Sequence, residues 1–218
     1  ELPITVGILR GISHGYTNFA NEVMIDRLAK VSGRGPIELR AELLSENERA
    51  AIVMKELQVI NDASPLADGM SRGYAFAFEG VPGRPYQYYS GHMADVRRLE
   101  DGRIKVHKIW VVADHGRVIN PQSFKRQIHS SIVFALSMMR SGKITMKNGQ
   151  IEQGNFDDYP VSLIGEGAEN VDIKLLDNGA HPMGCGEKMQ AGLQPAIANA
   201  IEGLTGEDVT GIPIEGLA

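Results

Sequence analysis

One stretch of the sequence decides the fold: His181-Pro-Met-Gly-Cys-Gly-Glu-Lys-Met-Gln-Ala-Gly-Leu-Gln-Pro-Ala-Ile-Ala-Asn-Ala200. Gly184 and Gly186 flank a cysteine, and Glu187 follows the second glycine directly. Glycines let a backbone approach a ligand closely, and a carboxylate in a dry pocket can act as a general base. The residues from Pro195 to Leu204 predict a helix. Taken alone, these residues favour a simpler interpretation, in which Glu187 only lies near the positive end of that helix dipole.

Two motifs in this stretch resemble a known family. Gly-Cys-Gly-Glu ends at Glu187, and Pro-Ala-Ile-Ala-Asn-Ala begins at Pro195. Together they resemble the C-terminal active-site segment of the xanthine oxidase family of molybdenum hydroxylases, in particular the molybdopterin-binding subunit of the isoquinoline 1-oxidoreductase and aldehyde dehydrogenase type. The family pattern is Gly-x-Gly-Glu-Pro, and its glutamate is the catalytic base. The resemblance therefore implies that Glu187 is the base, although Lys188 replaces the usual proline.

The composition limits the class of protein. The chain has 218 residues, of which 43% are hydrophobic, which is enough for one or two packed domains. Its formal net charge of −5 argues against nucleic acid or an anionic membrane as a partner. The single cysteine, Cys185, excludes an internal disulfide framework and a cysteine-rich iron–sulfur or zinc site within the chain. No apolar run is long enough to span a bilayer, and no signal peptide is visible.

The N-terminal part of the chain predicts a strand and three helices. The strand and a following loop occupy residues 1–15. Apolar residues then recur with helical spacing, which predicts helices at 16–31, 36–44 and 46–60. Thr17 or Asn18 is expected to cap the first helix. Its buried stripe is expected to consist of Phe19, Val23, Ile25, Leu28 and Val31.

The period of the apolar residues changes to two beyond the third helix, which predicts strands. The strands are expected at 72–80, 86–98, 104–113 and 169–176, with an edge strand at 209–214. A long helix is predicted at 121–139, and Asn148-Gly149 predicts a hairpin over 143–152. The fold class is therefore α+β, with mixed sheets and packed helices. We expect a strand-loop and helical segment at 1–62 and the cofactor-binding lobe at 63–218, joined intimately.

The resemblance extends over nearly the whole chain. Asp114-His-Gly-Arg-Val-Ile-Asn-Pro121 matches the family pattern Asp-x-Gly-x-x-(Val/Ile)-Asn-Pro, and we expect it to shape a turn. Asp157 and Asp158 lie in a similar family motif and are read as turn formers, and His14 as a structural residue. The family's N-terminal Gly-Gln-Gly segment is absent here. The chain thus resembles the C-terminal half of a molybdopterin-binding subunit, made separately or cut from a longer chain, and completed by a partner chain.

Several further residues are candidates for contact with a cofactor. Arg10 could be a surface charge or a bidentate donor to an anion, and the resemblance places Arg10-Gly11 near the pterin. Gln127 lies one residue off the apolar stripe of its helix, where a solvent-facing role is the simpler interpretation. The resemblance instead implies that Gln127 contacts the cofactor, together with the backbone of Cys185-Gly186. His129 is a candidate substrate contact, because His129-Ser-Ser replaces the family's Glu-Gly-Gly.

The resemblance implies an oxidoreductase that hydroxylates an N-heterocycle or oxidises an aldehyde with water as the oxygen source. It implies a molybdenum–molybdopterin cofactor, with the cytosine dinucleotide form as one option, and [2Fe-2S] clusters in a separate small subunit. It leaves the compartment open between the bacterial periplasm and the cytoplasm. The alternative is a non-catalytic structural subunit whose site has decayed at His129-Ser-Ser and Lys188. A serine hydrolase is disfavoured, because no Gly-x-Ser-x-Gly motif is present.

Overall fold

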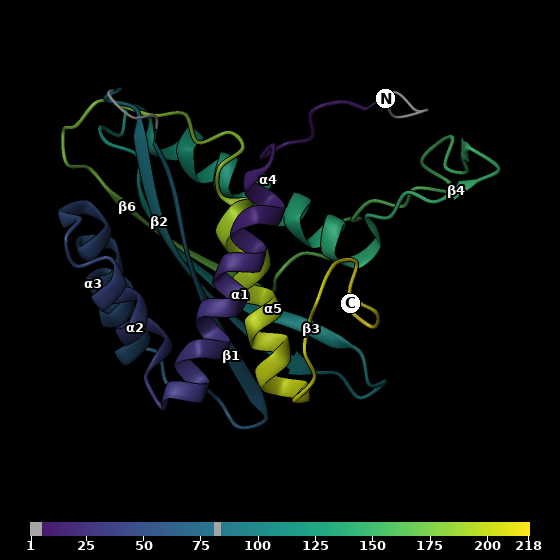
Figure 1. The fold of residues 1–218 in the computed structure, drawn as a ribbon, viewed down its shortest axis with the longest axis horizontal. Coiled ribbons are helices and arrows are strands. Elements are labelled where there is room, and N and C mark those ends of the chain that lie inside the picture. The colour runs from purple at the N-terminus through teal and green to yellow at the C-terminus, as the bar shows by residue number, and fades with distance from the viewer. Residues whose placement is uncertain (1–5, 81–83) are drawn as a thin grey trace.

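The computed structural model describes residues 6–80 and 84–218 (Figure 1). Its main sheet has the strand order β1-β2-β3-β6. The strands are β1 (Met70–Gly80), β2 (Gln87–Arg98), β3 (Ile104–Asp114) and β6 (Asn170–Leu176). The β1–β2 and β2–β3 pairs are antiparallel, whereas β6 runs parallel to β3. A separate hairpin consists of β4 (Met146–Lys147) and β5 (Gln150–Ile151), with the predicted Asn148-Gly149 turn between them.

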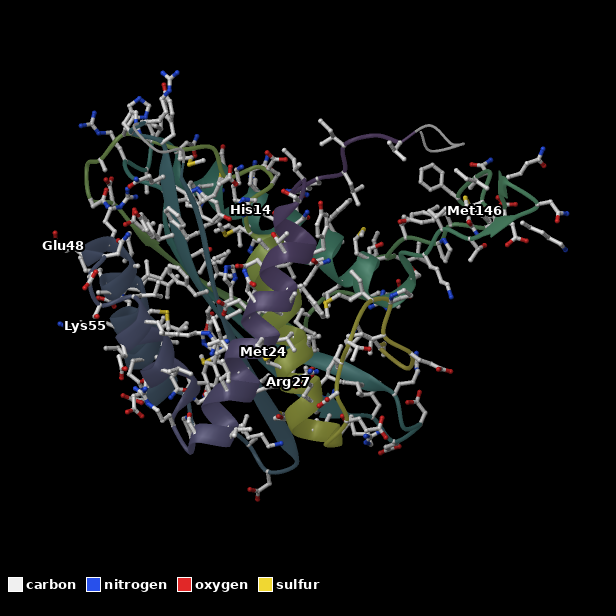
Figure 2. All side chains as sticks on the ribbon, in the orientation of Figure 1. His14, Met24, Arg27, Glu48, Lys55 and Met146 are labelled. Atoms are coloured by element: carbon white, nitrogen blue, oxygen red, sulfur yellow. The ribbon has the colours of Figure 1, made fainter. Side chains whose placement is uncertain are left out.

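Helices cover both faces of the sheet, which confirms the predicted α+β class. They are α1 (His14–Ser32), α2 (Pro36–Leu43), α3 (Glu48–Asp62), α4 (Pro121–Ser141) and α5 (Gln190–Thr205). Helices α2 and α3 pack on one face, and α4 and α5 on the other, with α1 alongside α5 (Figure 1). Glu48 and Lys55 project from the outer side of α3, and Met146 lies on the hairpin that extends away from the sheet (Figure 2). The division at 62/63 stays a prediction.

Helix α5 packs closely on β1 and β2, because a glycine stands at each of two points of contact. A Cβ on Gly73 of β1 would stand 2.2 Å from the backbone of Ala196 and Ala200. A Cβ on Gly192 of α5 would stand 2.0 Å from the ring of His92. The Pro-Ala-Ile-Ala-Asn-Ala motif therefore has a structural reason: only small side chains let this helix rest directly on the strands.

At the free edge of β1, side chains make the backbone hydrogen bonds that a neighbouring strand would otherwise make. The side chain of Asn18 donates to the Phe76 carbonyl at 2.9 Å, and the Phe76 N–H donates to the Glu22 carboxylate at 2.8 Å. The Tyr74 carbonyl accepts from Asn199 at 2.8 Å and from Arg40 at 3.1 Å. Buried backbone groups need such partners. These bonds therefore fix α1, α2 and α5 against the same edge.

Arg40 is the charged centre of this edge. Its guanidinium is 1% exposed and makes five hydrogen bonds, to the Glu22 carboxylate, Asp26 carboxylate and carbonyls of Glu22, Pro36 and Tyr74. Burial raises the pKa of the Glu22 carboxyl, and Arg40 opposes that rise. A buried guanidinium is tolerated because every donor has an acceptor.

Helix α5 begins five residues earlier than predicted, at Gln190, so that Pro195 lies inside the helix. Proline has no N–H, which leaves the carbonyl four residues earlier, that of Ala191, without its helical donor. The side-chain amide of Asn18 supplies that donor at 2.8 Å. The same amide bonds Phe76, so Asn18 joins α1 to both β1 and α5. The predicted capping role of Asn18 or Thr17 is wrong, because α1 starts at His14.

Two further predictions fail in part or in full. The predicted apolar stripe of α1 is confirmed at Val23, which is buried, and at Phe19, which packs against the core. It is wrong at Leu28 and Val31, which are exposed, while Glu22 and Ala29 are buried. Helix α1 packs through charged side chains with bonded partners and through small residues. A pattern of apolar residues in the sequence does not detect either. Residues 209–214 form no strand, and only Leu217 makes a bridge, to Ile104. The strand and loop predicted at 1–15 lie partly in residues 1–5, outside the described residues. Residues 6–9 form neither helix nor strand, and α1 begins at His14.

Two histidines are buried beneath the start of α5. His92 is 0% exposed, and its Nε2 lies 2.8 Å from the Ser90 hydroxyl. His115 lies between the rings of Tyr88 and Phe124, each 4.9 Å away by ring centroid. Burial lowers the pKa of His92 to about 3 and that of His115 to about 4. Both rings are therefore neutral in the folded protein at ordinary pH.

Within the described ranges, none of the helices is both long and apolar enough to cross a membrane.

Asn18→Ala is expected to lower the free energy of unfolding by about 1–3 kcal/mol, because two buried carbonyls would lose their donor. Urea denaturation of the purified protein measures this change. Asn21→Ala is the matched control, since Asn21 is an exposed asparagine on the same helix. Equal losses in the two variants would contradict the bridging role of Asn18.

The buried histidines predict a loss of stability in mild acid. Their pKa values in the folded protein lie below the value of about 6.5 in the unfolded chain, so the unfolded state takes up protons first. Stability is fully present above pH ~6.5 and falls below it, by about 2 kcal/mol per histidine at pH 5. His92→Gln should roughly halve this fall, measured by denaturation at several pH values. Exposed His129→Gln is the control, and an unchanged slope in His92→Gln would refute the assignment.

Candidate functional site

The Arg10-Gly11 turn contacts both α4 and the turn before α5. The Arg10 Nε donates to the Gly186 carbonyl at 2.7 Å. Its terminal nitrogens donate to the hydroxyls of Ser130 at 3.0 Å and Ser131 at 2.9 Å. The guanidinium also lies over the ring of Phe134, with its centre 5.6 Å from the ring centroid. Arg10 therefore acts as a tie between three segments of the chain.

Glu187 is oriented by the same turn. The Gly11 N–H donates to Glu187 Oε2 at 3.3 Å. Gly11 has a φ of 89°, and a Cβ there would stand 2.1 Å from the Gln190 amide nitrogen. Both the positive φ and the close approach require glycine at this position. The Glu187 side chain is 38% exposed, so its carboxylate faces the surface of this chain.

Gln127 lies beside the Gly186 backbone. Its Oε1 is 3.9 Å from the point where a Cβ of Gly186 would stand. Among the described residues its side-chain amide makes no hydrogen bond, and Gln127 is exposed. A Cβ on Gly184 would meet no described atom within 4 Å. This part of the surface thus combines a free amide with an uncovered glycine backbone, which are groups that can bind a polar ligand.

Charged and titratable groups surround the turn. Lys188 Nζ lies 2.5 Å from Glu79 of β1 and 3.6 Å from Glu187 Oε1. The His14 Nε2 lies 3.9 Å from Glu79, at the N-terminal end of α1 (Figure 2). Burial, reinforced by Glu79 and Glu187, raises the pKa of the Tyr88 hydroxyl. Burial also raises the pKa of the Cys185 thiol, although nearby Arg10 opposes it. Tyr88 and Cys185 are therefore neutral at ordinary pH.

The structure brings together all the predicted site residues except His129. Arg10, Gly11, Gln127 and Gly186-Glu187 are joined by the contacts above, with Cys185 in the same turn. His129 lies instead in a separate hollow of about 550 Å³ at the β6 edge, with Trp110 and Lys125 among its walls. Its position gives no support to a substrate contact beside Glu187. The roles of all these residues toward a cofactor stay predictions.

Sequence reasoning missed four contributors to the site. Ser130 and Ser131 appeared only as bulk in place of glycines, yet their hydroxyls bind Arg10. Glu79 and Tyr88 appeared only as strand residues. In the structure Glu79 binds the Lys188 ammonium, and the Tyr88 hydroxyl donates to the Lys188 carbonyl at 3.4 Å. The serines carried a detectable signal, because two hydroxyls on a helix face are suitable acceptors for a predicted arginine. Glu79 carried none, since its partner is 109 residues away.

The turns predicted from aspartates are present. Asp114 accepts from Arg49 at 2.6 Å and from the Gly116 N–H at 3.0 Å, which closes the turn after β3. Asp158 accepts from the backbone of Gly154 and Asn155. In the part of the chain that the structure describes, no three His, Cys, Asp or Glu side chains form a group suited to a metal ion.

Known proteins share both the sequence pattern and the fold. The chain is 24% identical over 97% of its length to the beta chain of isoquinoline 1-oxidoreductase from Brevundimonas diminuta, of which it covers 27%. It is 28% identical over 94% of its length to a nicotinate dehydrogenase subunit from Pseudomonas putida, of which it covers 18%. The chain thus spans about a quarter or less of the length of these relatives.

Solved structures agree on the fold. Aldehyde oxidoreductase from Desulfovibrio desulfuricans superposes with a TM-score of 0.76 at 14% identity, over 94% of this chain and 40% of that one. Quinoline 2-oxidoreductase from Pseudomonas putida superposes with a TM-score of 0.53 at 20% identity, over 59% of this chain and 17% of that one. Residues 22–166 match the family model of the molybdopterin cofactor-binding domain. The chain therefore belongs to the molybdopterin cofactor-binding domain family of the molybdenum hydroxylases, as its motifs predicted.

Proposed function

We propose that this chain supplies the catalytic base and part of the cofactor cradle of a molybdenum hydroxylase. The observation that carries the proposal is the contact between Arg10-Gly11 and Gly186-Glu187, which joins two predicted site motifs 176 residues apart. The carboxylate of Glu187 lies in this contact with an N–H bond to orient it. The relatives whose names include isoquinoline, nicotinate and aldehyde substrates support an oxidoreductase of this kind.

The residues present fit a molybdopterin cofactor. A pterin offers ring nitrogens, an amino group and a carbonyl, and the free Gln127 amide can both donate to and accept from such groups. The open backbone at Gly184 and Gly186 allows close approach. Arg10 holds this backbone through the Gly186 carbonyl at 2.7 Å, so that its part is to fix the cradle. We therefore assign cofactor contact to Gln127, Gly11 and Cys185-Gly186, with Arg10 holding them in place.

Glu187 is placed to move a proton. The cofactor, when bound, supplies the oxygen derived from water and accepts an electron pair from the substrate. Glu187 accepts the proton that the attacking oxygen loses, because one carboxylate oxygen is oriented by Gly11 while the carboxylate stays accessible. The site is open in this chain, so the remainder of the enzyme would have to close it and exclude water.

We propose an N-heterocycle or an aldehyde as the substrate class, which the names of the relatives favour. The chain covers only 18–27% of two of these relatives, which supports a further segment or chain carrying the rest of the molybdenum subunit. A small subunit with [2Fe-2S] clusters would take the electrons away, since the single cysteine here cannot hold a cluster. The cytosine dinucleotide form of the cofactor belongs to the same proposal.

The alternative of a decayed, structural subunit receives less support. Ser130 and Ser131 bind Arg10, and Lys188 binds Glu79, so the residues that depart from the family pattern have defined contacts. The departures thus leave Arg10 and Glu187 held in defined positions, which favours a maintained site.

Glu187→Gln is expected to lower turnover by about 10²–10⁴-fold, because the amide cannot accept the proton. Molybdenum content, measured by mass spectrometry of the metal, should stay at the wild-type level, since the carboxylate does not hold the cofactor. Glu215→Gln, an exposed glutamate distant in sequence from the turn, is the control. Normal turnover in Glu187→Gln would refute the proposed function.

Gln127→Met should lower cofactor content more than turnover, because it keeps the length of the side chain but removes the amide proposed to bond the cofactor. We expect the molybdenum and pterin content of the purified enzyme to fall, while the molecules that retain cofactor keep most of their turnover. Gln122→Met is the matched control, an exposed glutamine on the same helix. Full cofactor content in Gln127→Met would contradict the assigned contact.

A further inference from the structure

Lys188 lies between two carboxylates at the start of α5. Its Nζ is 2.5 Å from both oxygens of Glu79 and 3.6 Å from Oε1 of Glu187. The side chain of Lys188 is 14% exposed and that of Glu79 is 22% exposed. Charges that are partly removed from water interact more strongly than exposed pairs. The arrangement of these three charges therefore bears on where the Glu187 carboxylate rests.

Residues of the sheet bind both the side chain and the backbone of Lys188. Glu79 belongs to β1 and binds the side chain, and Tyr88 of β2 donates to the Lys188 carbonyl at 3.4 Å. The ammonium is consequently anchored by a residue outside its own turn. Its distance from Glu187 is set by the strands, and the contact partner is Glu79 even though Glu187 is the adjacent residue.

We propose that Glu79 and Lys188 form a positioning pair that orients Glu187 and keeps the Lys188 ammonium 3.6 Å from its Oε1, beyond hydrogen-bond distance. This inference rests on the proposed role of Glu187 as the base. With Glu79 in place, the ammonium attracts Oε1 from 3.6 Å while Oε2 stays bonded to the Gly11 N–H. The carboxylate is thereby held from two sides, yet no cation occupies the oxygen that must accept a proton.

Removing Glu79 and removing Lys188 should disturb Glu187 in two different ways. Without Glu79, the ammonium is free to contact Glu187 and competes with the proton for its oxygen. Without Lys188, the carboxylates of Glu79 and Glu187 repel each other and the base is displaced. Removal of both charges together avoids both effects. The family pattern has proline at this position, which cannot carry a charge, so the pair is a feature of this sequence.

The test is a double-variant cycle in the complete purified enzyme. We expect Glu79→Gln and Lys188→Met each to lower kcat about tenfold or more, with a smaller change in KM. The double variant should recover to within about threefold of wild type, because coupled residues are not additive. Glu56→Gln, Lys174→Met and their double are the matched control, since this ion pair lies between α3 and β6. These control variants should keep wild-type kcat.

Cross-linking gives a second readout that does not depend on turnover. A water-soluble carbodiimide activates a carboxylate, a touching lysine amine then forms the amide, and the reagent leaves as a urea that has taken up the elements of water. In the wild-type enzyme the new amide should join the peptides of Glu79 and Lys188, detected by mass spectrometry. In Glu79→Gln it should form within the single peptide that holds Glu187 and Lys188. The Glu56–Lys174 pair is the positive control for the reagent.

Two results would overturn the positioning pair. One is a double variant whose loss equals the product of the two single losses. The other is no Glu79–Lys188 amide in an enzyme in which Glu56 and Lys174 do cross-link. If Glu187→Gln is inactive in that same preparation, the pair alone is wrong and the proposed function stands. If Glu187→Gln keeps full turnover, the base is wrong and the pair has no base to position.

Discussion

The hydrogen bonds along the free edge of β1 determine where the other elements lie. An edge strand presents backbone groups that need partners, and here they come from side chains of α1, α2 and α5. Asn18 also donates to the carbonyl that Pro195 leaves free, so one amide fixes a helix to a strand and to a second helix. With α5 held on the strands at Gly73, the turn before α5 has a fixed position. Glu187 lies in that turn.

The site follows from this constraint. Arg10 begins the segment that leads into α1, and it reaches α4 and the Gly186 carbonyl together. Because α1 and α5 are both fixed to the β1 edge, their N-terminal ends meet, and Gly11 can bond Glu187. The position of the Glu187 carboxylate therefore depends on hydrogen bonds that lie far from it. The same constraint explains why small residues repeat along α5, since bulk there would lift the helix and move its first turn.

The local elements could be predicted from the sequence, whereas long-range pairings could not. Apolar periods located β1 to β3 and α4 to within a few residues, and Asn148-Gly149 located the hairpin, because these signals lie within each element. The start of α5 was missed because Pro195 resembles a first-turn residue. The amide that permits proline inside the helix belongs to Asn18, which lies 173 residues from the Ala191 carbonyl that it bonds. The buried face of α1 was missed because Glu22 is buried only when Arg40 binds it. In the site, motif resemblance pointed to Glu187, Arg10 and Gln127. Ser130 and Ser131 carried a signal as acceptors for an arginine, while Glu79 became visible only through its partner Lys188.

If Glu187 is the base, the turn joining Arg10-Gly11 to Gly186-Glu187 faces the molybdenum cofactor. An anomalous difference map at the molybdenum absorption edge, from crystals of the complete enzyme, tests it most directly. We expect one molybdenum peak beside the carboxylate of Glu187, with the Gln127 amide against the cofactor. A molybdenum peak elsewhere in the enzyme, with Glu187 facing only protein or solvent, would contradict it.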